Sequence, residues 1–427
     1  MKAVIMAGGK GTRIAPLHPE IPKPMIPLSG KPVLAYELEC LKSQGYQDVI
    51  IVVGHLKDSI MTYFGNGNKW GMRIRYIEED SPLGTAGALY YLKEETEEDI
   101  LLLNGDIIFD IDIRRLYNWH RQHGGLATLL THPNDHPYDS GIIVTDSNDR
   151  VTDWLHKEDP RLWYRNQVNA GIHILSPGIF RQQNNLFREP KKLDLDRDIL
   201  KPLISSKELY AYSSPEYVKD MGTPERLAMV EADLKTGRVQ ARNLQKAQKA
   251  IFLDRDGTIN QNMGFVRRPE EFVLLPHAAD AIRAINQSGY LAIVVTNQPV
   301  IARGEASVEQ LQEIHNKMET LLGNEGAYVD AIYYCPHHPD KGYAGEVKSL
   351  KIDCDCRKPK PGMLLQAARN YNIDLSQSWM AGDSERDILA GNAAGCRTAY
   401  LGSPEQAYGQ SVTFASLKEF TDSIMKG

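Results

Sequence analysis

KAVIMAGGKGTR, residues 2–13, joins a short apolar run to a glycine-rich turn, and this join decides how the first half of the chain folds. An apolar run that ends in glycines predicts a buried strand followed by a tight turn. Backbone N–H groups in such a turn can surround phosphate oxygens, and a following helix can add its positive end. The turn has neither the Walker spacing nor the dinucleotide fingerprint, so by itself it fits a phosphate cradle and a plain corner equally well.

Strand-like runs alternate with helical stretches along the whole chain, which predicts an α/β fold with mostly parallel strands. A length of 427 residues is enough for two ordinary domains. The segment 224–250 is polar, helix-prone and free of strand signals. We therefore expect two domains, at residues 1–240 and 249–427, with a linker at 241–248. The second should contain four strands, read from IFLD, LAIVVTN, VDAIYYC and SWMAGD.

Composition narrows the classes of partner. The formal net charge is −6 at pH 7, so no basic excess argues for nucleic acid. The apolar start is too short for a signal peptide, and no run approaches the roughly 18 apolar residues of a membrane span. We expect a cytoplasmic protein that acts on small molecules, with no nucleic-acid or membrane partner. The oligomeric state is left open, a homo-oligomer included.

The first half resembles the sugar-1-phosphate nucleotidyltransferases. The motifs that carry the resemblance, in the family's order, are GGKGTR, PLGTAGAL, NGD, LHKEDP, VNAGIHIL and KDMGTPERL. The resemblance implies a Rossmann-like domain with a mixed sheet. In that family a sugar 1-phosphate oxygen attacks the α-phosphorus of a nucleoside triphosphate and pyrophosphate leaves, a reaction that depends on positioning and charge neutralisation. The form of PLGTAGAL is similar to the mannose-1-phosphate guanylyltransferase type, which implies GTP.

The resemblance also implies roles for single residues of the first half. Arg13 and the glycine-rich turn would hold the triphosphate, Lys23 the transferred phosphate, and Asp106 with Asp220 a Mg²⁺ ion, which prefers oxygen ligands. Lys157 would hold the sugar phosphate; it follows His156 where the family commonly has Glu, so a sugar contact is expected to differ. The substrate-binding set is Gly8, Gly9, Gly11, Thr12, Gly84, Thr85, Gly87, Lys157 and Asn169.

A second stretch, IFLDRDGTIN at residues 251–260, places Asp254 at the end of an apolar strand and Asp256 two residues later. A carboxylate can accept a phosphoryl group, and a second can protonate the leaving oxygen and then activate water. The stretch resembles the haloacid dehalogenase-like phosphatases. The resemblance implies that Lys358 stabilises charge beside the nucleophile. It further implies that Mg²⁺ is held by Asp254, Asp383 and the Asp256 carbonyl, and that Thr296, Asn297 and Arg357 bind substrate.

Three cysteines and a histidine have the residue types and spacing of a closed, tetrahedral structural Zn²⁺ site. The set is Cys335, His337, Cys354 and Cys356, and His338 could replace His337 because spacing does not choose between neighbours. Cys40 and Cys396 have no such neighbours in the sequence and are interpreted as core thiols.

This zinc loop before RKPKPGM, with VVTNQPVIARG earlier, makes the second half resemble the D-glycero-D-manno-heptose 1,7-bisphosphate 7-phosphatases; Pro299 and Val300 depart from the usual Ser-Gly. Together the halves imply a bifunctional enzyme that makes a nucleotide-activated heptose, GDP-D-glycero-D-manno-heptose, a surface-glycan precursor. Three alternatives stay open: a phosphatase for histidinol phosphate, a transferase for mannose 1-phosphate or another hexose, and a domain that senses sugar phosphates without turnover.

Overall fold

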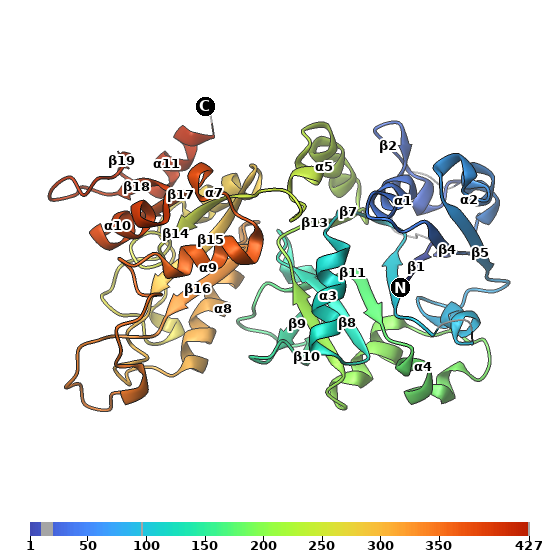
Figure 1. Cartoon of the computed structure of the whole chain (residues 1–427), viewed down its shortest axis with the longest axis horizontal. Helices are drawn as coiled ribbons and strands as arrows, with labels where there is room; N and C mark the ends of the chain where they lie inside the picture. The colour runs from blue at the N-terminus through green and yellow to red at the C-terminus, as the bar shows by residue number, and fades with distance from the viewer. Residues whose placement is uncertain (10–19, 95–96, 426–427) are drawn as a thin grey trace. The chain divides into compact units, whose positions relative to one another are not determined.

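The computed structural model describes residues 1–9, 20–94 and 97–425, which form two compact units (Figure 1). Unit 1 contains Met1–His132, Ile143–Trp154 and Asn169–Asn243. Unit 2 contains Pro133–Ile142, Leu155–Val168 and Leu244–Gly427. Two short segments of the first half therefore belong to the same unit as the second half.

Unit 1 is built on a sheet of nine strands. Seven follow the order β10-β9-β11-β6-β1-β4-β5, β8 also pairs with β11, and β12 pairs with β8. At its centre β1 (Lys2–Met6) pairs in parallel with β4 (Asp48–Val53) and β6 (Ile100–Asn104). β11 (Val168–Leu175) runs antiparallel to β6, so the sheet is mixed, and the predicted fold class is confirmed. The other strands of this sheet are β5 (Arg73–Glu78), β8 (Ala127–His132), β9 (Ile142–Thr145), β10 (Val151–Leu155) and β12 (Leu209–Ser213).

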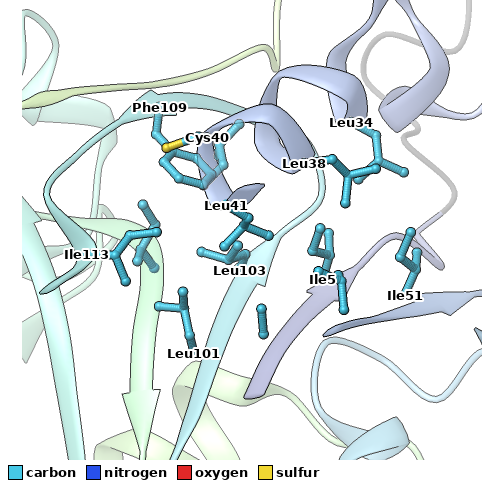
Figure 2. Close-up of a cluster of buried hydrophobic side chains, with 14 of the residues drawn as sticks. Ile5, Leu34, Leu38, Cys40, Leu41, Ile51, Leu101, Leu103, Phe109 and Ile113 are labelled. Atoms are coloured by element: carbon cyan, nitrogen blue, oxygen red, sulfur yellow. The ribbon is translucent and has the colours of Figure 1, made fainter. Parts of the chain in front are cut away.

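Helix α1 (Val33–Ser43) covers one face of this sheet, because its apolar residues recur at helical spacing. Leu34, Leu38 and Leu41 are fully buried against Ile5 and its strand neighbours (Figure 2). Cys40 lies in the same cluster, as expected for a core thiol. The remaining helices of unit 1 are α2 (Lys57–Phe64), α3 (Ile113–His123), α4 (Gly178–Gln182), α5 (Pro224–Lys235) and α6 (Arg238–Ala241).

A separate two-stranded ribbon in unit 1 brings distant parts of the chain together. β7 (Ile107–Asp110) and β13 (Tyr217–Asp220) pair antiparallel, with Asp220 opposite Ile107. Asp106 precedes β7 and Asp220 ends β13, so both carboxylates lie at the same end of the ribbon. A second small ribbon pairs β2 (Pro27–Leu28) with β3 (Lys31–Pro32).

Unit 2 has a parallel sheet with the order β16-β15-β14-β17-β18-β19. Ile251 and Leu253 of β14 face one apolar cluster, while Ala250 and Phe252 face another, so both faces are covered as parallel sheets require. Its strands are β14 (Lys249–Leu253), β15 (Tyr290–Asn297), β16 (Ala331–Cys335), β17 (Trp379–Gly382), β18 (Arg397–Leu401) and β19 (Val412–Phe414).

The helices of unit 2 lie on both sides of this sheet. Residues of α7 (Ala278–Asn286), α8 (Val308–Asn324) and α11 (Leu417–Ile424) contribute to one cluster, and residues of α9 (Gly362–Tyr371) and α10 (Glu385–Ala394) to the other. The predicted strands coincide with β14, β15, β16 and β17, whereas β18 and β19 extend the sheet beyond the prediction. Of the helices the structure describes, none is long and apolar enough to cross a membrane.

Candidate active sites and metal centre

The phosphatase candidates of unit 2 gather where the parallel strands end, the edge at which open α/β sheets bind ligands. Asp254 follows β14, Asn297 ends β15 and Asp383 follows β17. The N–H of Asp254 donates to the carbonyl of Ala381 at 3.0 Å, which joins two of these strand ends directly.

Lys358 is the centre of a charged cluster at this edge. Its Nζ donates to Asp254 Oδ1 at 2.7 Å and lies 2.6 Å from Asp387 Oδ1, and 3% of its side chain is exposed. Burial raises the pKa of Asp254 to about 7, because it outweighs the opposing effect of Lys358. Burial alone would lower the pKa of Lys358, but Asp254 and Asp387 raise it, so the ammonium stays charged beside the candidate nucleophile.

Asp256 faces a different set of donors. Its carboxylate accepts hydrogen bonds from Arg255 Nη2 at 2.8 and 2.9 Å, from Asn260 Nδ2 at 3.0 Å and from Gln298 Nε2 at 2.9 Å. Burial would raise the pKa of Asp256, but these donors and the Arg255 charge outweigh it, and the pKa is lowered. The pKa values of the two carboxyl groups of the DRD sequence are thus shifted in opposite directions, and the raised value belongs to Asp254 and not to Asp256, where an acid would be expected to have it.

Three carboxylates in this cluster fit a hard cation. Asp254, Asp383 and Asp387 each offer one oxygen, and these atoms all lie within 4.8 Å of one another. A Cβ atom at Gly257, which has φ +88°, would overlap the Asp383 carboxylate, so this glycine allows the close approach. Carboxylate oxygens are the ligands that Mg²⁺ prefers.

Thr296 and Asn297 lie beside this cluster, but their polar atoms are used within the protein. Thr296 Oγ1 accepts from Gln298 Nε2 at 2.9 Å. Asn297 exchanges two hydrogen bonds of 3.0 Å with the backbone N–H and carbonyl of Lys358. Asn297 therefore holds the segment that carries Lys358, a contact that differs from the predicted bond to phosphoryl oxygens.

A cavity of about 340 Å³ opens above the carboxylates and carries a second group of cations. Arg303, Arg357 and Arg386 line it together with Asp254 and Lys358. The Arg303 guanidinium lies 4.6 Å from the Phe265 ring and 4.5 Å from the Tyr343 ring, so it is held between two aromatic faces. Pro299 and His338 also line the cavity, whereas Val300 is buried in a neighbouring apolar cluster.

The four predicted zinc ligands lie together beside this cavity. Ligand atoms of Cys335, His337, Cys354 and Cys356 are all within 4.8 Å of one another, and His337 Nδ1 is 3.3 Å from Cys356 Sγ. His338 instead lies 3.5 Å from Arg303, so the structure brings His337 to the thiols. The Cys335 thiol lowers the pKa of Cys356 to about 5 through a hydrogen bond, which favours the thiolate that Zn²⁺ binds.

The glycine-rich turn of unit 1 is described as far as Gly9; Gly11, Thr12 and Arg13 lie outside the described residues. Glu79 approaches Gly8 so closely that a Cβ atom there would be 2.5 Å from Glu79 Oε2. Burial raises the pKa of Glu79 to about 7. Among the residues that the structure describes, Glu79 Oε1 has no hydrogen-bond partner.

The predicted transferase carboxylates both have cationic partners. Lys23 Nζ donates to Asp106 Oδ2 at 2.9 Å, so a predicted phosphate ligand meets a predicted metal ligand. Arg226 Nη1 donates to both oxygens of Asp220, at 3.0 and 2.9 Å. Asp106 and Asp220 offer carboxylate oxygens at the same end of the ribbon, and such oxygens are ligands that Mg²⁺ prefers.

The other transferase candidates are spread more widely. Gly84 and Gly87 lie against the backbone of Leu193 and Lys191, where a Cβ atom would overlap a carbonyl oxygen. Thr85 Oγ1 accepts from the N–H of Leu195 at 2.7 Å. The remaining two are Asn169, whose Nδ2 donates to Asp196 at 3.4 Å in unit 1, and Lys157, which is exposed in unit 2.

Comparison with known proteins agrees with both sites. The nucleotidyl transferase family matches residues 2–237. The chain belongs to that family. The HAD-hydrolase-like family matches residues 355–405, which include Lys358, Asp383 and Asp387.

The curated relatives of the second half show that the chain also belongs to a second family, the heptose bisphosphate phosphatases. The D-glycero-beta-D-manno-heptose-1,7-bisphosphate 7-phosphatase of Pasteurella multocida is 44% identical over 154 residues, which are 36% of this chain and 81% of that protein. A solved D,D-heptose 1.7-bisphosphate phosphatase of B. bronchiseptica, complexed with magnesium and phosphate, is 34% identical and covers 42% of this chain and 99% of its own, with a TM-score of 0.37. A solved HddC of Yersinia pseudotuberculosis, complexed with GMP-PN, is 26% identical and covers 55% and 99%, with a TM-score of 0.46.

This nucleotidyltransferase is therefore also a phosphatase, and the chain carries two enzyme activities. The alternative of a domain that only senses sugar phosphates is set aside. Sequence reasoning did not include Asp387 among the metal candidates, although its spacing from Asp383 at the start of a helix is a usable signal. It also missed Glu79, because a glutamate at the end of a strand carries no motif.

Proposed function

We propose that this nucleotidyltransferase–phosphatase removes the 7-phosphate from D-glycero-D-manno-heptose 1,7-bisphosphate and transfers GMP from GTP to the resulting heptose 1-phosphate. The observation that carries the proposal is the unit 2 cavity, which places Arg303, Arg357 and Arg386 in the same space as Asp254 and Lys358. The name of the Pasteurella multocida relative supports the choice of heptose.

Charge in this cavity separates the two candidate phosphatase substrates. A bisphosphate brings a second dianion, which guanidinium groups bind through paired N–H donors. Histidinol phosphate instead brings an ammonium group, which the arginines would repel where the second phosphate of a bisphosphate would bind, while Asp254, Asp256, Asp383 and Asp387 line the rest of the charged surface. The cavity therefore favours a sugar bisphosphate, with one phosphate at Asp254 and the other at the arginines.

In the proposed hydrolysis Asp254 attacks the 7-phosphorus, the bond to the sugar oxygen breaks, and Asp256 gives that oxygen its proton. Water then attacks the aspartyl phosphate, Asp256 takes a proton from the water, and phosphate leaves. Lys358 balances charge on Asp254 and the phosphoryl oxygens throughout. Mg²⁺, held by Asp254, Asp383 and the Asp256 carbonyl, would supply further neutralisation of the phosphoryl charge.

Glu79 supports GTP as the nucleotide donor. The Watson–Crick edge of guanine presents two neighbouring N–H donors, at N1 and N2, and a carboxylate offers two acceptors in one plane. Adenine, cytosine and uracil do not present two neighbouring donors on that edge. A buried carboxylate beside Gly8, with one oxygen unpartnered among the described residues, suits guanine.

In the proposed transfer the heptose 1-phosphate oxygen attacks the α-phosphorus of GTP and pyrophosphate leaves. No protein atom becomes part of a covalent intermediate, so the residues act by holding two polyanions together. Lys23 would hold the transferred phosphate, Lys157 the sugar phosphate and Asn169 a sugar hydroxyl. Mg²⁺, held by Asp106 and Asp220, would neutralise the triphosphate charge.

Comparative kinetics test the phosphatase substrate. We expect kcat/KM for the heptose bisphosphate to exceed that for histidinol phosphate. Arg303→Met should lower kcat/KM for the bisphosphate by roughly 10- to 100-fold, the effect of about 1.5–3 kcal/mol from hydrogen bonds to a charged group. The same variant should not lower turnover of histidinol phosphate. A wild-type enzyme that prefers histidinol phosphate contradicts the proposal.

A further inference from the structure

Arg255, between the two aspartates of the DRD sequence, has no predicted role and no place in the reaction described so far. Its side chain is completely buried, with 0% exposed. Asp254 and Asp256 line the cavity and Arg255 does not. Arg255 therefore lies behind the reacting groups and cannot touch a substrate there.

The guanidinium of Arg255 joins Asp256 to a helix on the other side. Its Nη2 donates to both oxygens of Asp256, at 2.9 and 2.8 Å, and its Nε donates to Oδ1 at 3.3 Å. Its Nη1 lies 3.3 Å from Nε2 of His315, a buried residue of α8. Because arginine can only donate, His315 Nε2 must accept, which places the imidazole proton on Nδ1.

These contacts fix the orientation of one carboxyl group. The rigid fork of a guanidinium sets the plane of a carboxylate that it binds through both oxygens. Asn260 and Gln298 each bind one oxygen of the same group, at 3.0 and 2.9 Å. His315 in turn restricts the guanidinium from behind, so the arrangement is set by the packed helix α8 and not by the cavity.

We propose that Arg255 is a positioning residue for Asp256, the acid–base group of the phosphatase, and that His315 holds Arg255 in place from α8. This inference rests on the proposed phosphatase mechanism. When the bond between phosphorus and the leaving oxygen breaks, the Asp256 proton moves to that oxygen and negative charge develops on Asp256. Arg255 is already in place to stabilise this charge, so no rearrangement is needed at that moment.

A purely structural role makes a different prediction. A buried arginine that only neutralises a buried aspartate would, when removed, damage every reaction of unit 2 alike. A residue that acts through the proton donor matters only where the leaving oxygen needs a proton. Phenol is a poor leaving group that needs one, whereas 4-nitrophenolate leaves without protonation.

The test compares kcat/KM for phenyl phosphate and 4-nitrophenyl phosphate in the full-length enzyme with Mg²⁺. This parameter covers the steps up to release of the phenol and excludes hydrolysis of the aspartyl phosphate. We expect Arg255→Met to lower the value for phenyl phosphate by about 10- to 100-fold, a part of the usual effect of acid catalysis, and that for 4-nitrophenyl phosphate by less than about threefold. Arg255→Lys should recover part of the loss. Arg283→Met is the matched control, because Arg283 pairs with Asp280 on α7 and does not line the cavity.

Equal losses with both esters would overturn the proposal. Should Arg255→Met fail to fold, His315→Gln carries the same comparison with a smaller expected selectivity, because Asp256 keeps its other donors. If the wild-type enzyme hydrolyses neither the esters nor the heptose bisphosphate, that result contradicts both the proposed mechanism and this inference. If the wild-type enzyme hydrolyses the esters but not the heptose bisphosphate, only the proposed substrate is ruled out, and the comparison of the two esters still tests the role of Arg255.

Discussion

The phosphatase and transferase sites differ in how much of the reaction the protein itself supplies. In unit 2 the proposed nucleophile, the proposed acid–base group and the lysine already contact fixed partners, and Lys358 Nζ is 2.7 Å from Asp254. In unit 1 the candidate cation Lys23 contacts the candidate metal ligand Asp106. In the transfer that we propose, no side chain attacks phosphorus. A protein that provides the nucleophile must orient that side chain before the substrate binds. A protein that joins two bound substrates instead needs cations and binding surfaces that orient the substrates and neutralise their charge.

The largest effect is expected when the proposed nucleophile of unit 2 is removed. Asp254→Asn should lower phosphatase turnover by at least about 10³-fold, because the amide cannot form the phosphorylated intermediate. Pyrophosphate release from heptose 1-phosphate and GTP should stay within about twofold. Asp220→Ala is the reciprocal variant, expected to abolish the transfer and spare the hydrolysis. Loss of both activities in either variant would show that the sites are not independent.

A smaller effect is expected at the base contact of the transferase. Glu79→Gln should lower kcat/KM for GTP by roughly 10- to 100-fold, the effect of one charged hydrogen-bonding group, and should lower it less for ATP. In the wild type, Glu79 with a pKa of about 7 is a carboxylate above that pH and protonated below it. Because guanine needs two acceptors, kcat/KM for GTP should fall as the pH drops through about 7.

The glutamine variant also supplies the control for this pH profile. Since the amide does not titrate, Glu79→Gln should flatten the decline between pH 8 and pH 6 that the wild type is expected to show. A wild-type profile that the substitution leaves unchanged would exclude Glu79 as its cause. An equal fall in kcat/KM for GTP and ATP would show that Glu79 does not bind the base and acts only through its contact with Gly8.

The smallest effect on chemistry should come from the metal centre of unit 2. Cys354→Ser removes one of the thiolates, so bound zinc, measured by elemental analysis, should fall below one per chain. Unfolding of unit 2 should shift down by roughly 5 °C or more, since a structural metal contributes folding free energy. Cys396→Ser is the control, a buried thiol outside the cluster that should leave the zinc content unchanged. Full zinc content in Cys354→Ser would contradict the proposed ligand set.

The sequence predicted unit 2 more fully than unit 1 because its site follows strand ends. Asp254 and Asp383 each follow a buried apolar run, and parallel strands carry such residues to one edge. The Cys/His cluster was predictable because thiolates and imidazole at short spacing have few other uses than metal binding. Asp387 was left out of the metal set because its approach to Asp254 depends on how α10 begins.

In unit 1 the sequence could not show which residues meet. The pairing of β7 with β13 brings Asp106 and Asp220 to the same end of the ribbon although they are 114 residues apart in the sequence, and no local pattern encodes that register. The contact of Glu79 with Gly8 brings together the ends of β5 and β1, which have β4 between them in the sheet. The role of Asn297 was also beyond reach, because its two hydrogen bonds go to the backbone of a distant loop.

Mass spectrometry of the products tests whether this one chain carries out both proposed reactions in sequence. Purified full-length enzyme would receive Mg²⁺, an equimolar mixture of GTP, ATP, CTP, UTP and dTTP, and either anomer of D-glycero-D-manno-heptose 1,7-bisphosphate in separate tubes. We expect GDP-heptose, inorganic phosphate and pyrophosphate from one anomer. Heptose 1-phosphate without a nucleotide sugar would contradict the transferase assignment, and unchanged bisphosphate in both tubes would contradict the heptose bisphosphate as the substrate of this enzyme.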